Sequence, residues 1–108
     1  MKTIKEGDIR TLLKARVTAC GGEVRAVSWL GRKNAPDVLT LLPFTIEWFG
    51  ERGRINRNVG SHVFIETKRP GKDATAAQAR EHARMRDAGC VVLMVRDEQE
   101  LNQWLPPL

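Results

Sequence analysis

The sequence has few aromatic residues, few cysteines and no long apolar run. Tyrosine is absent from the 108 residues, and Trp and Phe contribute three residues each, so no row of aromatic side chains is available to stack successive single-stranded bases. No apolar stretch approaches the roughly twenty residues of a membrane-spanning helix, and the start, MKTIKEGDIR, lacks the apolar segment of a secretory signal. We therefore expect a protein that has no membrane partner.

Cysteine and histidine are too sparse for a structural zinc site. Cys20 and Cys90 are the two cysteines, and they have neither CxxC spacing nor a nearby pair of histidines. Such a pattern favours two reduced, packed thiols in an intracellular protein over a disulfide framework or a zinc cluster.

Acidic residues are outnumbered by basic ones. Eighteen Lys and Arg against thirteen Asp and Glu give a formal net charge of +5 at pH 7, and the isoelectric point is about 9.8. A basic chain of this kind favours an anionic polymer as its partner, with phosphate contacts as the source of attraction. The hydrophobic fraction of 42% is ordinary for one folded domain, so we expect residues 1–108 to form a single domain.

The pattern of apolar residues and of turn residues predicts three helices, three strands and a hairpin. Helices are predicted over residues 4–19, 74–88 and from 97 to the prolines at 106 and 107. Strands are predicted over residues 23–30, 37–42 and 90–95, and a hairpin over 44–65 with arms 44–50 and 61–66 joined by a polar loop. The helix over 74–88 would be capped by Asp73 or Thr75.

The element order is therefore α-β-β-β-α-β-α. The helix over 74–88 joins two strands as a crossover does, which predicts that these strands are parallel neighbours. The fold class is α/β, with a mixed sheet flanked by helices.

The stretch FIETKRPG contains charged residues where a buried strand ends. Glu66 and Lys68 are two residues apart, so on a strand they share one face at a separation of roughly 6.5–7 Å. A buried carboxylate without a partner is costly, and a hard divalent cation such as Mg²⁺ or Mn²⁺ would remove that cost.

A second carboxylate stands after a proline in the stretch NAPDVLTL. Asp37 precedes the strand over 37–42, and if that strand pairs with the strand ending at Glu66, the two acids meet at one end of the sheet. Together with the backbone carbonyl of Thr67 they would hold Mg²⁺ or Mn²⁺ against a phosphodiester. Lys68 would orient a water or offset charge in the transition state.

Each of these residues also has an ordinary structural interpretation. Asp37 alone is typical of a turn residue, and Glu66 with Lys68 is typical of a solvated pair. His82 is expected at the helix surface or the core edge, and Trp29, Trp48 and Trp104 in the core or an interface. The acids become informative through their combination.

That combination resembles a known family. Pro36-Asp37, a gap of 28 residues and then Glu66-Thr67-Lys68 match the PD…ExK signature of the restriction-endonuclease-like nucleases. The stretches GRKNAPDVL, IETKRPG and DAGCVVLMVRDEQELNQWL, with Gln78 between the last two, are similar to a VRR-NUC domain of the stand-alone, virus-encoded type. The resemblance covers nearly the whole chain. It departs from the family where Asn34 replaces a usual glycine, and Asn34 is expected to take the left-handed turn that glycine would.

The resemblance implies roles for individual residues. Asp37 and Glu66 match the metal-binding acids, Lys68 matches the catalytic lysine, and Gln78 matches a helix glutamine that reaches toward the site. Glu6 resembles an acid on the first helix that assists the metal through water, although a first-turn acid also suits the helix dipole. The cofactor implied is Mg²⁺ or Mn²⁺.

Basic residues in three segments are expected to bind the DNA backbone. They are Arg25, Arg32, Lys33, Arg52, Arg54, Arg57, Arg69 and Lys72. The family implies a homodimer that cuts four-way (Holliday) junctions in the cytoplasm of a bacterium or a phage-infected cell, with Trp48 and Phe49 as candidate dimer contacts. Two other interpretations stay open, which are a non-catalytic DNA-binding module and a sequence-specific restriction-type enzyme.

Overall fold

The computed structural model describes residues 4–49, 55–58 and 61–106, with the backbone alone for 47–49 and 55–58. Its helices are α1 (Glu6–Ala19), α2 (Ala76–Asp87) and α3 (Glu98–Asn102). Its strands are β1 (Glu23–Ala26), β2 (Val38–Leu41), β3 (Ile46–Phe49), β4 (Ile55–Asn58), β5 (His62–Thr67) and β6 (Val91–Val95). Among these residues, none of the helices has the length and apolar character needed to cross a membrane.

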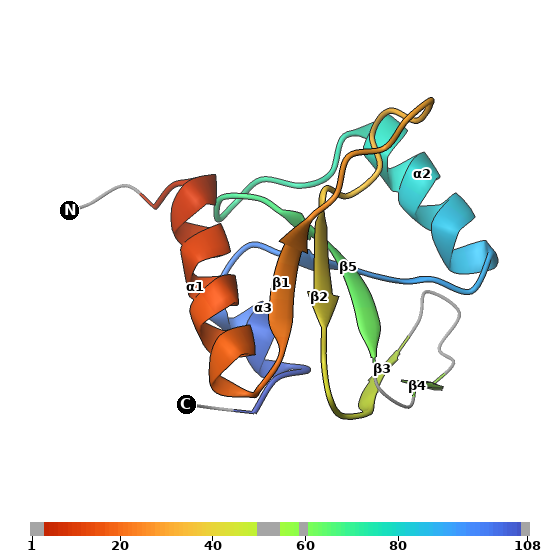
Figure 1. Cartoon of the computed structure of the whole chain (residues 1–108). Helices are drawn as coiled ribbons and strands as arrows, with labels where there is room; N and C mark the ends of the chain where they lie inside the picture. The colour runs from red at the N-terminus through yellow and green to blue at the C-terminus, as the bar shows by residue number, and fades with distance from the viewer. Residues whose placement is uncertain (1–3, 50–54, 59–60, 107–108) are drawn as a thin grey trace.

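Four strands form a mixed sheet in the order β1-β2-β5-β6 (Figure 1). β1 and β2 are antiparallel, β2 and β5 are antiparallel, and β5 and β6 are parallel. The predicted order α-β-β-β-α-β-α is confirmed for the elements that build this sheet, and so is the parallel pair on either side of α2.

The predicted hairpin with arms 44–50 and 61–66 is wrong. The first arm contains β3, which pairs with β4 from the stretch expected to be a polar loop. The second arm contains β5, which pairs with β2 and β6 inside the main sheet. β5 lies between β2 and β6, so both of its edges are already paired in the central sheet. β3 therefore pairs with β4, the next strand in the sequence.

The predicted strand over 23–30 is also too long, because its pairing with β2 ends at Ala26 apart from one further hydrogen bond, from the N–H of Val27 to the carbonyl of Asp37. Ala26 faces Val38, the first residue of β2. Before Val38 the chain leaves the sheet at Pro36, which has no N–H to donate to a strand ladder. Residues 27–36 therefore form a loop that leads from β1 back to Asp37.

The helices lie on two faces of the sheet. Successive strand residues point to opposite faces, and Thr67 contacts α1 whereas its neighbour Glu66 contacts α2. The core between the sheet and α1 with α3 is apolar, and each buried aliphatic side chain there contributes about 1.5–3 kcal/mol. Its members include Ile9, Leu13, Val17, Val38, Val63, Ile65, Val91, Val95, Leu101 and Leu105.

Helix ends follow the predicted capping residues. Thr75 caps α2, since its hydroxyl accepts a hydrogen bond from the N–H of Gln78. Asp97 caps α3 in the same way through the N–H of Glu100. Gly89, just after α2, has a φ of 98°, which is the left-handed conformation that ends many helices.

Two arginines connect segments that are distant in sequence. Arg16 is 1% exposed, and its guanidinium contacts Glu98 and the carbonyl of Pro106, which fixes α1 to the C-terminal segment. Arg96 contacts Glu100 and Asp73, and the hydrogen bond to Glu100 raises the pKa of the Arg96 guanidinium. The two contacts of Arg96 connect α3 with the loop that follows β5.

Gly22 is predicted to resist substitution, whereas Gly7 is not. A Cβ at Gly22 would lie 2.5 Å from the backbone oxygen of Leu41, so Gly22→Ala should lower the free energy of unfolding by about 1–3 kcal/mol. A Cβ at Gly7, in the first turn of α1, meets nothing within 4 Å, so Gly7→Ala should raise it by about 0.5–1 kcal/mol. Urea unfolding of both variants measures the two signs, and an unchanged midpoint for Gly22→Ala would contradict this packing.

Candidate active site

The two predicted acids lie at one end of the sheet. Val38 faces Ile65 in the antiparallel pair of β2 and β5, so the next step of the register places Asp37 opposite Glu66. Asp37 immediately precedes β2 and Glu66 is next to last in β5, so both acids stand at the same end of the sheet. Their side chains meet different helices, since Asp37 contacts Arg10 of α1 and Glu66 lies against His82 of α2. The expected meeting of strands 37–42 and 61–68 is thus confirmed at the level of strand pairing.

Glu66 is a buried carboxylate that faces α2. The residue is 6% exposed, and its Oε1 lies 3.6 Å from Nε2 of His82, which is too long for a hydrogen bond. Nε2 of His82 is buried and has no hydrogen-bond partner among the residues that the structure describes. A buried polar atom without a partner, next to a carboxylate, is where a water or an ion fits.

Asp37 is held by an arginine from α1. Nη2 of Arg10 donates to both carboxylate oxygens of Asp37, at 2.9 and 3.0 Å. Nε of the same guanidinium donates to Oγ1 of Thr67 at 3.1 Å, and that hydroxyl donates in turn to Oε1 of Glu6 at 3.2 Å. Arg10 therefore links two of the acids that the sequence predicts for the site. It binds Asp37 directly and is connected to Glu6 through the hydroxyl of Thr67.

The turn before Asp37 is fixed by two features of the loop over 27–36. Asn34 has a φ of 67°, so the expectation that it takes the left-handed conformation in place of glycine is confirmed. The indole N–H of Trp29 donates to the carbonyl of Pro36 at 2.7 Å, and the Trp29 ring lies 5.5 Å from that of Phe64 on β5. The loop is thereby pinned to the sheet one residue before Asp37.

Lys68 and Gln78 stand on either side of the loop after β5. The backbone N–H of Lys68 donates to the carbonyl of Val95, which extends the pairing of β5 with β6 by one residue. Oε1 of Gln78 accepts a hydrogen bond from the N–H of Thr75 at 2.9 Å. In this arrangement the side-chain oxygen of Gln78 closes the cap of α2.

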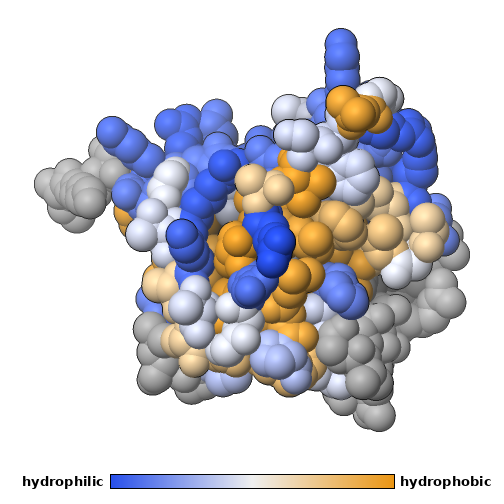
Figure 2. Space-filling view, in the orientation of Figure 1, coloured by the Kyte–Doolittle hydropathy of each residue, from blue (hydrophilic) through white to orange (hydrophobic). Residues whose placement is uncertain are grey.

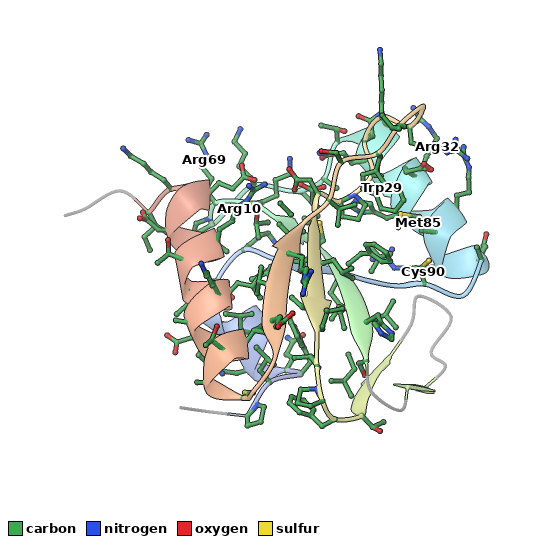
Figure 3. All side chains as sticks on the ribbon, in the orientation of Figure 1. Arg10, Trp29, Arg32, Arg69, Met85 and Cys90 are labelled. Carbon is green, nitrogen blue, oxygen red and sulfur yellow. The ribbon has the colours of Figure 1, made fainter. Side chains whose placement is uncertain are left out.

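Several of the predicted DNA-binding residues surround this end of the sheet. Figure 3 shows Arg10 and Arg69 on the side of α1 and Arg32 beside α2, with the end of the sheet between them. Arg69 is exposed, as is Lys72 in the same loop. Arg25 is exposed on β1, where its guanidinium lies 2.7 Å from Glu23.

The other basic residues that are predicted to bind DNA are the loop arginines Arg52, Arg54 and Arg57. Arg57 belongs to β4, and Figure 1 shows β3 and β4 at the end of the sheet opposite to Asp37 and Glu66. Arg52 and Arg54 lie outside the described residues, and the side chains of Trp48 and Phe49 are likewise not described.

Sequence reasoning missed two groups that contact the acids. Arg10 follows Glu6 by four residues on α1, the spacing of an ion pair on a helix, which is a signal that could have identified it. His82 was expected at the helix surface or the core edge, and it is 2% exposed and lies against Glu66. The contact of His82 with Glu66 depends on how α2 packs on the sheet, which the residue pattern of the helix does not specify.

The donor set at the end of the sheet fits a hard divalent cation. It offers the carboxylates of Asp37 and Glu66 and the backbone carbonyl of Thr67, and oxygen donors of this kind, completed by water and phosphate, suit Mg²⁺ or Mn²⁺. In the described part of the chain no three His, Cys, Asp or Glu side chains gather around one point.

Comparison with known proteins shows the family of the chain. No family model matches the chain. A protein of Acyrthosiphon pisum secondary endosymbiont phage 1, named "Putative nuclease p44", is 34% identical over 106 residues, which cover 98% of this chain and 97% of that protein. A solved structure of a VRR_NUC domain superposes with a TM-score of 0.68 at 34% identity, covering 93% of this chain and 92% of the other. The chain therefore belongs to the VRR-NUC family of restriction-endonuclease-like nucleases.

Proposed function

We propose that this protein is a metal-dependent, structure-selective DNA endonuclease that acts as a homodimer on four-way junctions in the cytoplasm of a bacterium or a phage-infected cell. Residues 1–108 would serve as one nuclease domain. The observation that carries the proposal is the strand register that sets Asp37 opposite Glu66 at one end of the sheet, with Lys68 two residues after Glu66, in a chain of a nuclease family.

Asp37, Glu66 and the Thr67 carbonyl would hold Mg²⁺ or Mn²⁺, and Glu6 would contribute through water. When bound, the ion supplies Lewis-acid stabilisation of the charge that develops on the phosphodiester. Burial of Glu66 keeps its carboxylate in a fixed position.

Two further residues complete the proposed catalytic set. Lys68 directly follows β5 and lies two residues after Glu66. It would orient the attacking water or stabilise the negative charge of the transition state. Gln78 would take part from the first turn of α2, where its backbone is already fixed by the Thr75 cap.

The basic residues around this end would position the DNA backbone without reading its sequence. The preference for a junction rests on the need for two symmetric cuts, which two copies of one site in a homodimer provide.

Removal of the Glu66 carboxylate should abolish cutting without abolishing binding. Glu66→Gln keeps the buried side-chain volume, and we expect cleavage of a labelled junction in Mg²⁺ or Mn²⁺ to fall by at least about 100-fold, because several kcal/mol of charge stabilisation are lost. Glu66→Ala should behave alike, and EDTA should stop the wild-type enzyme.

Asp87→Asn serves as the matched control, because Asp87 is an exposed acid at the far end of α2. Persistent cutting by both Glu66 variants would refute the assigned role. If the wild type cuts a plain duplex at one sequence, the restriction-type activity is favoured. Binding without any cutting in either metal would identify a non-catalytic module.

Arg10 should compete with the metal for Asp37. Its guanidinium and the Asp37 carboxylate are both about half exposed, and exposed ion pairs contribute about 0–1 kcal/mol, so Arg10→Ala should tighten Mn²⁺ binding up to about fivefold. Isothermal titration of Mn²⁺ measures the effect without DNA. Lys14→Ala, an exposed cation on the same helix, controls for net charge, and weaker Mn²⁺ binding by Arg10→Ala would show that Arg10 helps to build the site.

A further inference from the structure

A basic cleft lies beside the candidate active site, between α2 and the loop that leads to Asp37. Its volume is about 240 Å³. The polar and charged residues that line it are Arg32, Lys33, Asn34, Arg80, Glu81 and Arg84. The sequence predicts that Arg32 and Lys33 bind DNA, but its pattern does not connect them with α2.

The cleft has an excess of positive charge. Four cations and one carboxylate line it, which leaves a formal surplus of three positive charges. Glu81 does not neutralise all four cations, since its contacts are with Arg32, at 3.6 Å, and Arg84, at 3.3 Å. Lys33 and Arg80 have no acidic partner within the described ranges.

Glu81 holds the cleft in shape. Its side chain is 7% exposed, whereas those of Arg32 and Arg84 are 52% and 58% exposed. One buried carboxylate thus fixes a loop arginine and a helix arginine whose remaining N–H groups face solvent. Fixed guanidinium groups that keep free donors are the usual recognition elements for phosphate oxygens.

The cleft and the candidate active site share α2 as a wall. Glu81 directly precedes His82, whose Nε2 lies 3.6 Å from Glu66, and the opposite wall of the cleft is the loop that ends at Asp37. Figure 3 shows Arg32 on this loop next to α2, and Figure 2 shows hydrophilic side chains along the same upper edge of the molecule. A nucleic acid strand at the acids would therefore continue over the cleft.

We propose that this cleft binds a backbone phosphate of the DNA substrate outside the phosphate that is cut, with Arg80 and Arg84 of α2 acting together with the loop cations. The inference rests on the proposed function for the identity of the ligand as DNA. Contacts of this kind are independent of base sequence and set the position of the strand in the active site.

Arg80→Gln tests the proposal, because Arg80 is exposed and its loss breaks no ion pair within the described residues. Binding of a labelled junction and of a plain duplex is measured in EDTA over a range of salt concentrations. We expect roughly tenfold weaker binding at low salt and a decrease of about one in the slope of log affinity against log salt, as for one lost phosphate contact. Thermal unfolding should be unchanged.

Lys14→Gln on α1 removes the same charge away from the cleft and should change neither quantity. Equal affinity and slope for Arg80→Gln and wild type overturn the proposal, as does an equal loss in Lys14→Gln, which would indicate net charge alone. The cleft also fails as a DNA site if inorganic phosphate shifts the NMR signals of Arg80 while the variant binds DNA like wild type.

The outcomes separate the cleft from the catalytic proposal. If the wild type cuts a junction with Mg²⁺ and Arg80→Gln binds as tightly as wild type, the cleft fails and the nuclease stands. If Arg80→Gln weakens binding and no metal supports cutting, the cleft stands and the catalytic assignment fails.

Discussion

The register of β5 is the constraint on which the rest of this structure depends. Val63 and Ile65 are fully buried and point with Thr67 toward α1 and α3, so Glu66 must point to the face of α2. A slip of one residue would exchange these faces, which would put Glu66 in the apolar core and turn the valine and isoleucine toward α2. Antiparallel pairing with β2 and parallel pairing with β6 prevent that slip, and the same pairing brings Asp37 to Glu66.

Two acids at one end of a sheet repel each other, and the fold provides each with its own cation or polar partner. Arg10 from α1 binds Asp37, and His82 from α2 lies against Glu66. Arg10 and His82 thus meet the two acids from helices on opposite faces of the sheet. Arg10 is about half exposed, so its release from Asp37 costs little, whereas His82 is buried and keeps its place.

α2 is unusual because its buried residues are charged or titratable rather than apolar. Glu81 and His82 are the buried residues of this helix, and each contacts a different group: Glu81 holds the arginines of the basic cleft, and His82 faces Glu66. A helix packed in this way gains less from the hydrophobic effect than α1 does. Its packing is instead typical of a functional site, where local rules of stability are relaxed.

The sequence by itself determined the features that depend on neighbouring residues. These include the caps at Thr75 and Asp97, the turn at Asn34, the parallel strands joined by α2 and the acids of the PD and ExK motifs, because propensity, capping and alternation act over a few positions. The tertiary structure alone decided that β3 pairs with β4 and that Arg10 reaches Asp37. It also decided that His82 lies against Glu66 while its neighbour Glu81 lines the basic cleft. Those contacts join residues far apart in the chain, and their partners are set by how the helices pack on the sheet.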